Sequence, residues 1–429
     1  MIEQADAKRR FLVLQGPTRF FGELGRALAT QGHSVQRIFF TAGDRLSWRL
    51  PGAISFRRSI SDWPDFLEAR LEAWGITDII LFGDCRPLHV VAIRVAARRD
   101  IRVHVFEEGY LRPDWITFEQ GGVNGYSALP RDPAFYREAA TTLPSWRTGV
   151  AVAGGLRSRA AEIAISQLWS LLFAWRYPGY RTHLPRHPIA LGAGWIRRIA
   201  GAPIRHHRTR KMLSALAVTP RPYYLLPLQL DGDSQIRRHS PLGRMAPALR
   251  VAIRSFAQHA PTDTFLVIKE HPFDCRLQDW RRIAHATAAH CGIEDRVGYI
   301  EGGPLGTLIA NSRGIVTVNS TVGLSALSRG VPVIALGKAI YDLPGLTHQT
   351  GIDRFWQEGT APDRRLVASF CHVMARLTQI NGDFFSRAGR RLAVAGAVAR
   401  IGAAASLADE PIRPTGEPLQ QVQLRPNPA

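Results

Sequence analysis

Short apolar runs recur along the chain, and each run ends abruptly in polar residues or glycine. The runs are rich in Val and Ile and are about four to eight residues long, which predicts buried parallel strands. Segments with a helical spacing of apolar residues separate them, so the sequence predicts an α/β fold with helices on both faces of a parallel sheet. The runs are Phe11–Gln15, Val35–Phe40, Asp78–Phe82, Val103–Phe106, Tyr223–Leu230, Phe265–Ile268, Val297–Ile300, Gly314–Val318 and Val331–Leu336.

Two polar clusters in the second half of the chain follow predicted strands directly. Lys269–Pro272 ends one run and Asn319–Thr321 ends another. In a parallel α/β sheet the ligand lies beyond the carboxyl ends of the strands. Ser320 and Thr321 would also cap a helix, whose free N–H groups and positive dipole end favour a phosphate. The pattern predicts half of a nucleotide-sugar site.

A pair of acids follows a predicted strand in the first half. Glu107 and Glu108 come directly after Val103–Phe106 and before Gly109. Two carboxylates and a glycine at a strand end are suited to catalysis, although the same residues also suit a solvated turn. The spacing leaves both interpretations open.

The net charge is +20, which indicates an anionic partner such as nucleic acid, acidic lipid or a negatively charged substrate. An Arg-rich genome would give the same excess. The basic residues are concentrated in residues 156–212, which contain eleven Arg or Lys and one acid, Glu162, together with Trp169, Trp175 and Trp195. Cationic helices with tryptophan are typical of segments at an anionic bilayer surface, and a helical linker with a basic outer face is the alternative. Four prolines exclude one long helix: Pro178, Pro185, Pro188 and Pro203.

The sequence lacks the motifs that are typical of several classes of protein. There is no GxGxxG motif, P-loop or CxxC pair, so we expect neither a dinucleotide enzyme, an NTPase nor a zinc protein. The histidine pairs His183/His187 and His206/His207 could hold a metal, but they lie in a strongly basic segment, and we expect no metal. The four scattered cysteines suit a reduced cytoplasm. The charged N-terminus and the lack of about 18–20 consecutive apolar residues predict neither a signal peptide nor a spanning helix.

Four motifs in register resemble the capsule-polysaccharide proteins of the KpsS/LipB type. They are EEGYLRP (Glu107–Pro113), QLDGDSQ (Gln229–Gln235), KEHP (Lys269–Pro272) and NSTVGLSAL (Asn319–Leu327), and the opening Leu14–Asp44 is also similar. The resemblance covers about residues 10–400. It implies a retaining β-Kdo transferase of GT-B architecture, with two Rossmann-like domains facing across a cleft. The implied donor is CMP-Kdo, and the implied acceptor is a lysophosphatidylglycerol-type lipid that starts the linker of a capsule.

The resemblance also implies roles for individual residues. Retention normally needs a carboxylate nucleophile and a second acid/base group, about 5 Å apart if glycosidase logic applies. Asp233 is the expected nucleophile with Asp231 as its rival, and Glu108 is the expected acid/base with Glu107 as its rival. The expected donor-binding residues are Lys269, His271, Pro272, Asn319, Ser320 and Thr321, and those on the acceptor side are Gln15, Thr18 and Arg112.

We expect five segments: an acceptor domain (1–150), a basic helical insert between the domains (151–215), a donor domain (216–380), a closing helix (381–405) and a mobile tail (406–429). No cofactor or metal is expected. The expected partners are CMP-Kdo, an anionic lipid, the inner face of the cytoplasmic membrane, a KpsC-type transferase and an ABC capsule exporter.

Three other functions compete with the transferase. A non-catalytic export component would keep the pocket and the basic segment without needing the two acids. A GT-B sugar-nucleotide epimerase would turn over a UDP-sugar without an acceptor. A nucleic-acid-binding protein is suggested by charge alone, since no helix-turn-helix, zinc or RNP signature is evident.

Overall fold

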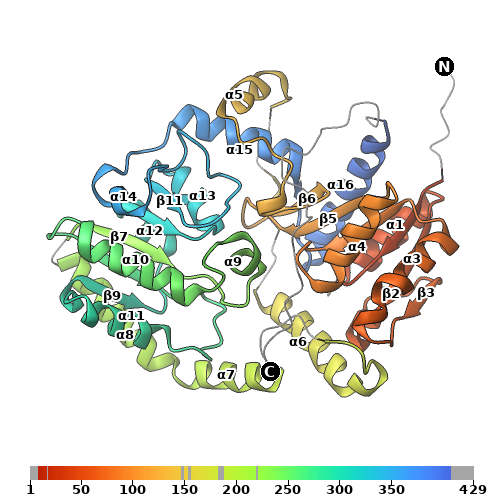
Figure 1. The fold of residues 1–429 in the computed structure, drawn as a ribbon, viewed down its shortest axis with the longest axis horizontal. Coiled ribbons are helices and arrows are strands. Elements are labelled where there is room, and N and C mark those ends of the chain that lie inside the picture. The colour runs from red at the N-terminus through yellow and green to blue at the C-terminus, as the bar shows by residue number, and fades with distance from the viewer. Residues whose placement is uncertain are drawn as a thin grey trace. The chain divides into compact units, whose positions relative to one another are not determined.

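The computed structural model describes residues 8–16, 18–145, 149–152, 156–181, 188–218 and 221–406. They fold into two compact units, each built on its own sheet (Figure 1). Unit 1 comprises residues up to 130, 147–183 and 377 onward, and unit 2 comprises 131–146 and 184–376. Both units alternate strands with helices, which confirms the predicted α/β class with two Rossmann-like domains.

Unit 1 contains a seven-stranded sheet in the order β12-β6-β5-β4-β1-β2-β3. Its five strands from β5 to β3 are parallel, whereas β6 and β12 run antiparallel. The sequence analysis identified four of these strands and missed the short β3, β6 and β12. The bounds are β1 (Arg10–Val13), β2 (Ser34–Phe39), β3 (Ala53–Ser55), β4 (Asp78–Phe82), β5 (Arg102–Glu108), β6 (Trp115–Gln120) and β12 (Gln379–Asn381).

Helices cover both faces of this sheet. The core on one face includes residues of α1 (Phe20–Thr30) and α16 (Arg387–Ser406), and the core on the other includes residues of α3 (Trp63–Trp74) and α4 (Pro87–Arg98). Proline in the first turn starts α3 and α4, and Gly75, at a φ of 56°, ends α3. The remaining helical elements of unit 1 are α2 (Ala42–Leu46), η1 (Ile60–Asp62), η2 (Asn124–Tyr126), α6 (Leu156–Leu172) and η3 (Ala174–Arg176).

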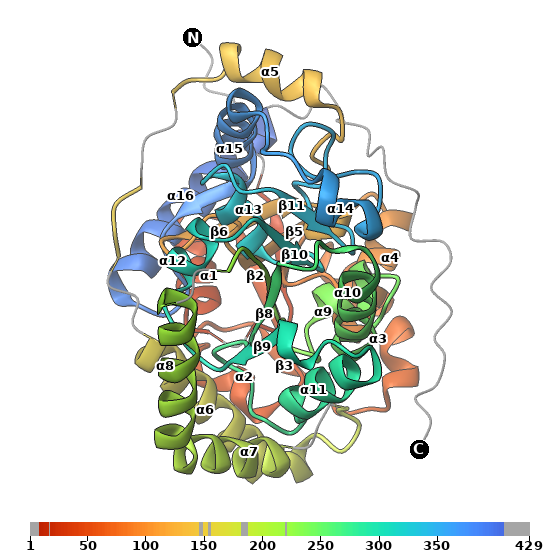
Figure 2. The ribbon, with the colours of Figure 1, turned by 90° about the vertical axis from the view of Figure 1, so that its left-hand side faces the viewer.

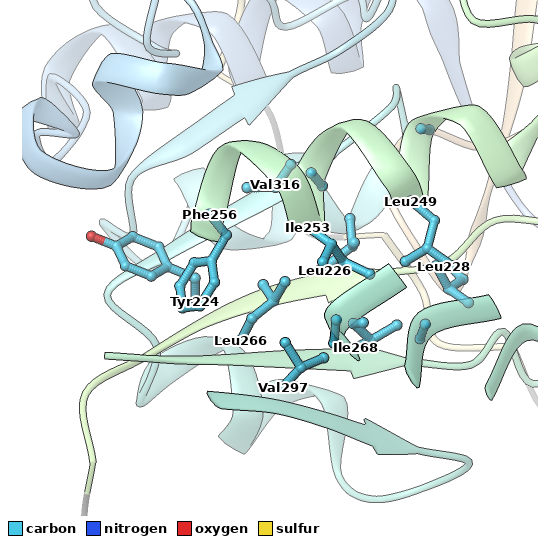
Figure 3. Packing of buried hydrophobic residues seen from close by; sticks show 14 of the residues in the cluster. Tyr224, Leu226, Leu228, Leu249, Ile253, Phe256, Leu266, Ile268, Val297 and Val316 are labelled. Atoms are coloured by element: carbon cyan, nitrogen blue, oxygen red, sulfur yellow. The ribbon is translucent and has the colours of Figure 1, made fainter. Parts of the chain in front are cut away.

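Unit 2 contains a five-stranded sheet in the order β11-β10-β7-β8-β9, in which every pairing is parallel. Figure 3 shows side chains of β7 such as Tyr224 and Leu226 packing with Ile253 and Phe256 of α10 (Met245–His259). Tyr223 points to the opposite face, where its hydroxyl donates to the carbonyl of Leu308. The strands are β7 (Tyr223–Pro227), β8 (Phe265–Lys269), β9 (Val297–Ile300), β10 (Gly314–Thr317) and β11 (Val333–Ala335).

The remaining helices of unit 2 follow the strands. They are α5 (Pro133–Thr142), α7 (Pro188–Ala200), α8 (Ala202–Val218), α9 (Ser234–His239), α11 (Trp280–His290), η4 (Glu294–Arg296), α12 (Leu305–Ala310), α13 (Thr321–Leu327), α14 (Ile352–Glu358) and α15 (Arg364–Thr378), whose last two residues belong to unit 1. None of the helices in the described segments combines the length and the apolar character needed to span a bilayer.

The units divide the chain differently from the predicted boundaries. Helix α5 belongs to unit 2 and lies beside α15 (Figures 1 and 2). Its buried Tyr136 packs on Phe370 of α15 with ring centroids 4.9 Å apart. The predicted insert is split, since α6 belongs to unit 1 and α7 and α8 belong to unit 2. After α15 the chain returns to unit 1, because β12 pairs with β6 and α16 packs on α1. The predicted tail lies outside the described residues except for residue 406.

A buried charge network closes the amino end of the unit 1 sheet. The Asp78 carboxylate accepts from Arg9 Nε at 2.9 Å, from Arg102 Nε at 3.0 Å and from His104 Nε2 at 2.8 Å. Arg9 Nη1 also donates to the carbonyl of Ile401, so the network ties α16 to β1 and β4. Burial alone would raise the pKa of Asp78, but the hydrogen bonds from His104 and Arg9 hold that pKa far below its usual range.

We predict that Asp78→Asn destabilises unit 1 by about 3 kcal/mol, because Arg9 and Arg102 lose the charge that they share. The folded-state pKa lies below the unfolded value of about 3.9, so this contribution is present above about pH 4 and is lost as the pH falls further. Urea unfolding between pH 3 and pH 7 measures both effects. Glu72→Gln, which removes an exposed carboxylate, should change stability by less than about 1 kcal/mol, and an equal loss in both variants would contradict the prediction.

Candidate functional site

The three polar clusters of unit 2 come together at one edge of its sheet. Gln229–Asp233 follows β7, and Asn319–Thr321 follows β10. Lys269 is the last residue of β8, and residues 270–272 follow it. Strand β7 lies between β10 and β8, and all three strands are parallel, so these residues share the carboxyl edge. This edge is where ligands bind in open parallel sheets.

A reciprocal amide pair connects two of the motifs. Gln229 Nε2 donates to Asn319 Oδ1 at 2.9 Å, and the Asn319 backbone N–H donates to Gln229 Oε1 at 3.1 Å. Asn319 Nδ2 also donates to the carbonyl of Gln235 at 2.7 Å. Both side chains are buried. The Asn319 side chain therefore positions the loop after β7 through its own hydrogen bonds.

Both candidate nucleophiles lie at helix starts in that loop. Asp233 is the N-cap of α9, and its Oδ1 accepts from the backbone N–H of Gln235 at 3.0 Å. Asp231 Oδ1 accepts from the backbone N–H of Met245, the first residue of α10, at 2.9 Å. Each carboxylate is thus held in place through one oxygen. The two acids remain rivals on this geometry.

Lys269 lies at the end of β8 and is 8% exposed. Burial lowers the pKa of its ammonium group, while neighbouring Glu270 raises it. The ammonium forms no hydrogen bond or ion pair with any side chain in the described segments. A desolvated cation that makes no hydrogen bond or ion pair among the described side chains is suited to an anionic ligand.

Glu270 is paired with a different cation. Its carboxylate accepts from Arg198 Nη1 of α7 at 2.6 Å and from the Tyr299 hydroxyl at 2.7 Å. Arg198 Nη1 also donates to the carbonyl of Asp274 at 2.7 Å. The basic helix α7 therefore supports the KEHP turn from within unit 2.

His271 presents a defined ring nitrogen. Its Nδ1 accepts from the backbone N–H of Phe273 at 3.1 Å, so the neutral ring carries its proton on Nε2. The Nε2–H group is thus compatible with the predicted role of His271 in binding the donor. Pro272, exposed to solvent, follows directly, and the backbone N–H of Asp274 donates to the carbonyl of His271 to close the turn.

Ser320 caps α13 as predicted, since its hydroxyl accepts from the backbone N–H of Val322 at 3.2 Å, and Thr321 is the first residue of the helix. The Tyr341 hydroxyl donates to the carbonyl of Ser320 at 2.5 Å. A Cβ atom at Gly323 would lie 2.2 Å from that hydroxyl, so only glycine fits there. Gly323 therefore leaves room for the Tyr341 hydroxyl, which holds Ser320 at the start of α13.

In unit 1, Glu107 and Glu108 are the last residues of β5, which is longer than predicted and continues through a hairpin-like turn into antiparallel β6. Ladder pairing with Thr117 and Ile116 excludes the freely solvated turn that the sequence left open. Glu108 forms an ion pair with Arg159 Nη1 of α6 at 2.9 Å, and its side chain is 21% exposed.

The predicted acceptor-side residues have separate partners within unit 1. Gln15 Nε2 donates to the Tyr180 hydroxyl at 3.0 Å. The hydroxyl of Thr18 is buried and finds no hydrogen-bond partner in the described segments. Arg112 is exposed, and its Nε donates to the carbonyl of Gly109 at 3.2 Å, which ties the loop together.

Arg86, between β4 and α4, is a candidate that sequence reasoning missed. Its guanidinium lies 5.2 Å from the ring centroid of Phe82 and forms no hydrogen bond or ion pair with any residue in the described segments. Burial lowers its pKa, and the charges of Tyr180, Glu107 and Asp44 partly offset this. The signal available in the sequence was the position of Arg86 after a predicted strand. Because the sequence contains many arginines, this position alone did not distinguish Arg86 from the others.

The described structure gives no support to either histidine pair as a metal site. His206 and His207 are adjacent, exposed residues of α8. His183 and His187 lie outside the described residues.

The chain matches the family model described as capsule polysaccharide biosynthesis protein over residues 77–385. It is 34% identical over 383 residues to the capsule polysaccharide export protein KpsS of Escherichia coli, which covers 88% of this chain and 97% of that protein. It is 33% identical over 395 residues to the capsule polysaccharide modification protein LipB of Neisseria meningitidis, with coverages of 89% and 93%. The chain therefore belongs to the capsule polysaccharide biosynthesis family, and within that family it is of the KpsS/LipB type.

Among solved structures, the chain is similar to the KpsC β-Kdo 2,7-transferase of Thermosulfurimonas dismutans. The TM-score is 0.42 at 14% sequence identity, with coverages of 92% of this chain and 100% of that structure.

We predict that Arg198→Met destabilises unit 2 by about 3 kcal/mol, because it leaves the buried Glu270 carboxylate with Tyr299 alone. Arg197→Met is the matched control, since Arg197 is exposed on the same helix, and it should have little effect. The double variant Arg198→Met/Glu270→Gln should recover more than half of the loss. Thermal unfolding followed by circular dichroism measures all three, and equal losses for Arg197→Met and Arg198→Met would refute the role of the pair.

Proposed function

We propose that this protein is a retaining glycosyltransferase that moves β-Kdo from CMP-Kdo to a lysophosphatidylglycerol-type lipid and so starts the linker of a capsular polysaccharide. The observation that carries the proposal is the meeting of three sequence-distant motifs at the carboxyl ends of β10, β7 and β8. The name of LipB, a modification protein, agrees with an enzymatic role.

The donor matches the chemistry of this edge. CMP-Kdo carries a phosphodiester and a sugar carboxylate, and both need positive or N–H donors. Lys269 supplies a desolvated cation, and His271 supplies an Nε2 proton. Such donors would stabilise the negative charge that develops on the departing CMP phosphate. No metal or other cofactor is required in this scheme.

Retention would proceed by two displacements. The Asp233 carboxylate attacks the anomeric carbon of Kdo, and the bond to the CMP phosphate oxygen breaks with its electron pair. The acceptor hydroxyl then attacks the same carbon, releases Asp233 and gives its proton to Glu108. Arg159 orients the Glu108 carboxylate for that proton transfer. Asp231 and Glu107 are the alternative residues for the two roles.

Arg86 would bind the phosphate of the lipid headgroup. Its guanidinium is partly desolvated and has no protein counter-ion within hydrogen-bond distance in the described segments. A guanidinium binds phosphate through two parallel N–H donors, which makes arginine well suited to this task. Gln15 and Thr18, at the end of β1, would complete the acceptor side.

A protein with this acceptor would work at the inner face of the cytoplasmic membrane, beside a KpsC-type transferase that extends the linker and an ABC exporter. The second candidate is a non-catalytic export component, which the name of the KpsS relative favours. It would bind the glycolipid without turnover, so it would tolerate neutral replacements of Asp233 and Glu108. A sugar-nucleotide epimerase would act without any lipid.

We predict that purified protein adds one Kdo to fluorescent lysophosphatidylglycerol when CMP-Kdo is generated in the reaction. Asp233→Asn and Glu108→Gln should each lower kcat by at least about 100-fold, since each removes a group that reacts. Mass spectrometry of the lipid measures the product. Asp231→Asn and Glu107→Gln are the matched controls for the two rival residues.

Each other outcome assigns the protein differently. Full activity of Asp233→Asn together with loss in Asp231→Asn would exchange the nucleophile. Lipid binding without transfer by the wild type would favour the export component. Turnover of a UDP-sugar without lipid would favour the epimerase.

We also predict that Arg86→Ala raises the KM for the lipid acceptor by about tenfold or more, because a charge-assisted hydrogen bond is worth about 1.5–3 kcal/mol. The KM for CMP-Kdo should stay nearly unchanged, and Arg86→Lys should restore part of the loss. Arg94→Ala, exposed on α4, is the control. A rise in the donor KM instead would place Arg86 on the donor side.

A further inference from the structure

Helix α6 has its polar side against the protein and its apolar side toward solvent. Positions that are partly buried carry polar residues such as Arg159, Glu162, Ser166 and Ser170. The opposite stripe contains Ile165, Leu168, Trp169 and Leu172, which are spaced as one face of a helix and are 41–56% exposed. A surface helix in water normally buries its apolar stripe, so α6 is reversed.

The polar side of α6 makes specific contacts along the carboxyl edge of the unit 1 sheet. Arg159 pairs with Glu108 at the end of β5. Glu162 Oε1 accepts from the backbone N–H of Arg19, next to the start of α1, at 2.8 Å. The backbone N–H of Gly43, in α2, donates to Ser170 Oγ at 3.2 Å, and a Cβ atom at Gly43 would lie 2.5 Å from the carbonyl oxygen of Ser166. These contacts fix α6 with its apolar stripe outward.

The part of the chain that follows the stripe carries charge of one sign. Between Glu162 and Asp231 the sequence contains ten Arg or Lys and no Asp or Glu. Arg176 and Arg181, just beyond α6, are exposed, and Trp175 beside them is 72% exposed. A second copy of this chain carries the same net charge of +20, which opposes self-association. An anionic bilayer complements both the charge and the apolar stripe.

Unit 2 contains the same reversal independently. In α7 and the start of α8, Ile196, Ile199 and Ile204 are 58–71% exposed, whereas Arg198 and Arg205 face the protein interior. Helices of both units with outward apolar residues are unlike the scattered exposed apolar residues of ordinary surfaces.

We infer that the outward stripe of α6 docks on an anionic lipid bilayer. In that position α6 joins the bilayer surface to the edge that holds Glu108, so a membrane-held acceptor would reach the catalytic edge along this helix. The second statement rests on the proposed function, but docking itself does not.

The test measures binding of the full chain to vesicles of phosphatidylcholine with and without phosphatidylglycerol, without donor or acceptor. The wild type should float with the vesicles that contain phosphatidylglycerol. Trp169→Glu/Leu172→Glu should lower the partition coefficient by at least about tenfold, since it replaces inserted apolar surface with charge. The control Val251→Glu/Leu377→Glu makes the same change of charge at two exposed apolar residues on α10 and α15 and should bind like the wild type.

Equal binding by the α6 variant and the control would overturn the inference. So would a wild type that ignores vesicles and is dimeric by light scattering while the α6 variant is monomeric, because a second copy would then cover the stripe.

A transfer assay separates this inference from the proposed function. With a short-chain, water-soluble acceptor the α6 variant should match the wild type, and with the acceptor embedded in vesicles it should be at least about tenfold slower. Loss of vesicle binding in the variant, with no Kdo transfer by any protein, would support docking and refute the transferase. Transfer by the variant at the wild-type rate on vesicles would support the transferase and refute delivery along α6.

Discussion

The reciprocal hydrogen bonds between Gln229 and Asn319 are the constraint on which the carboxyl edge of the unit 2 sheet depends. The two residues join the ends of β7 and β10, and through Asn319 Nδ2 they also hold the start of α9, where Asp233 is the N-cap. Because both side chains are buried, replacing either one would leave polar groups unpaired in the core. The QLDGDSQ and NST motifs are therefore one structural unit, and a change in either should move the candidate nucleophile.

The two ends of the unit 1 sheet differ in how their arginine side chains are paired. At the amino end, Arg9 is balanced by Asp78 and bonded to Ile401, which stabilises the fold. At the carboxyl edge, Arg86 has no hydrogen-bonded partner in the described segments, and Lys269 has the same character at the carboxyl edge of unit 2. Desolvated cations without a hydrogen-bonded partner cost stability, so their position at the sheet edge where α/β folds bind ligands is consistent with an anionic substrate.

The basic tryptophan-containing segment is part of the folded units. Arg159 of α6 pairs with Glu108, and Arg198 of α7 pairs with Glu270, so each helix places an arginine at the carboxyl end of a strand. Its apolar residues face outward because the inner positions are occupied by these polar contacts. The same helices thus combine support of the site with an exposed apolar surface, which composition alone could not distinguish from a linker.

The sequence by itself determined the α/β class, most strands, and the motifs at the strand ends, because parallel strands have a strong local signature and their direction places all carboxyl ends together. Only the tertiary structure decided which unit receives α5, α6 and α16, since those assignments depend on contacts such as Tyr136 with Phe370 between residues distant in the chain. It also separated the partly buried Arg86 and Arg198 from the many solvated arginines. Burial and pairing are properties of packing, and a residue type at a given spacing does not encode them.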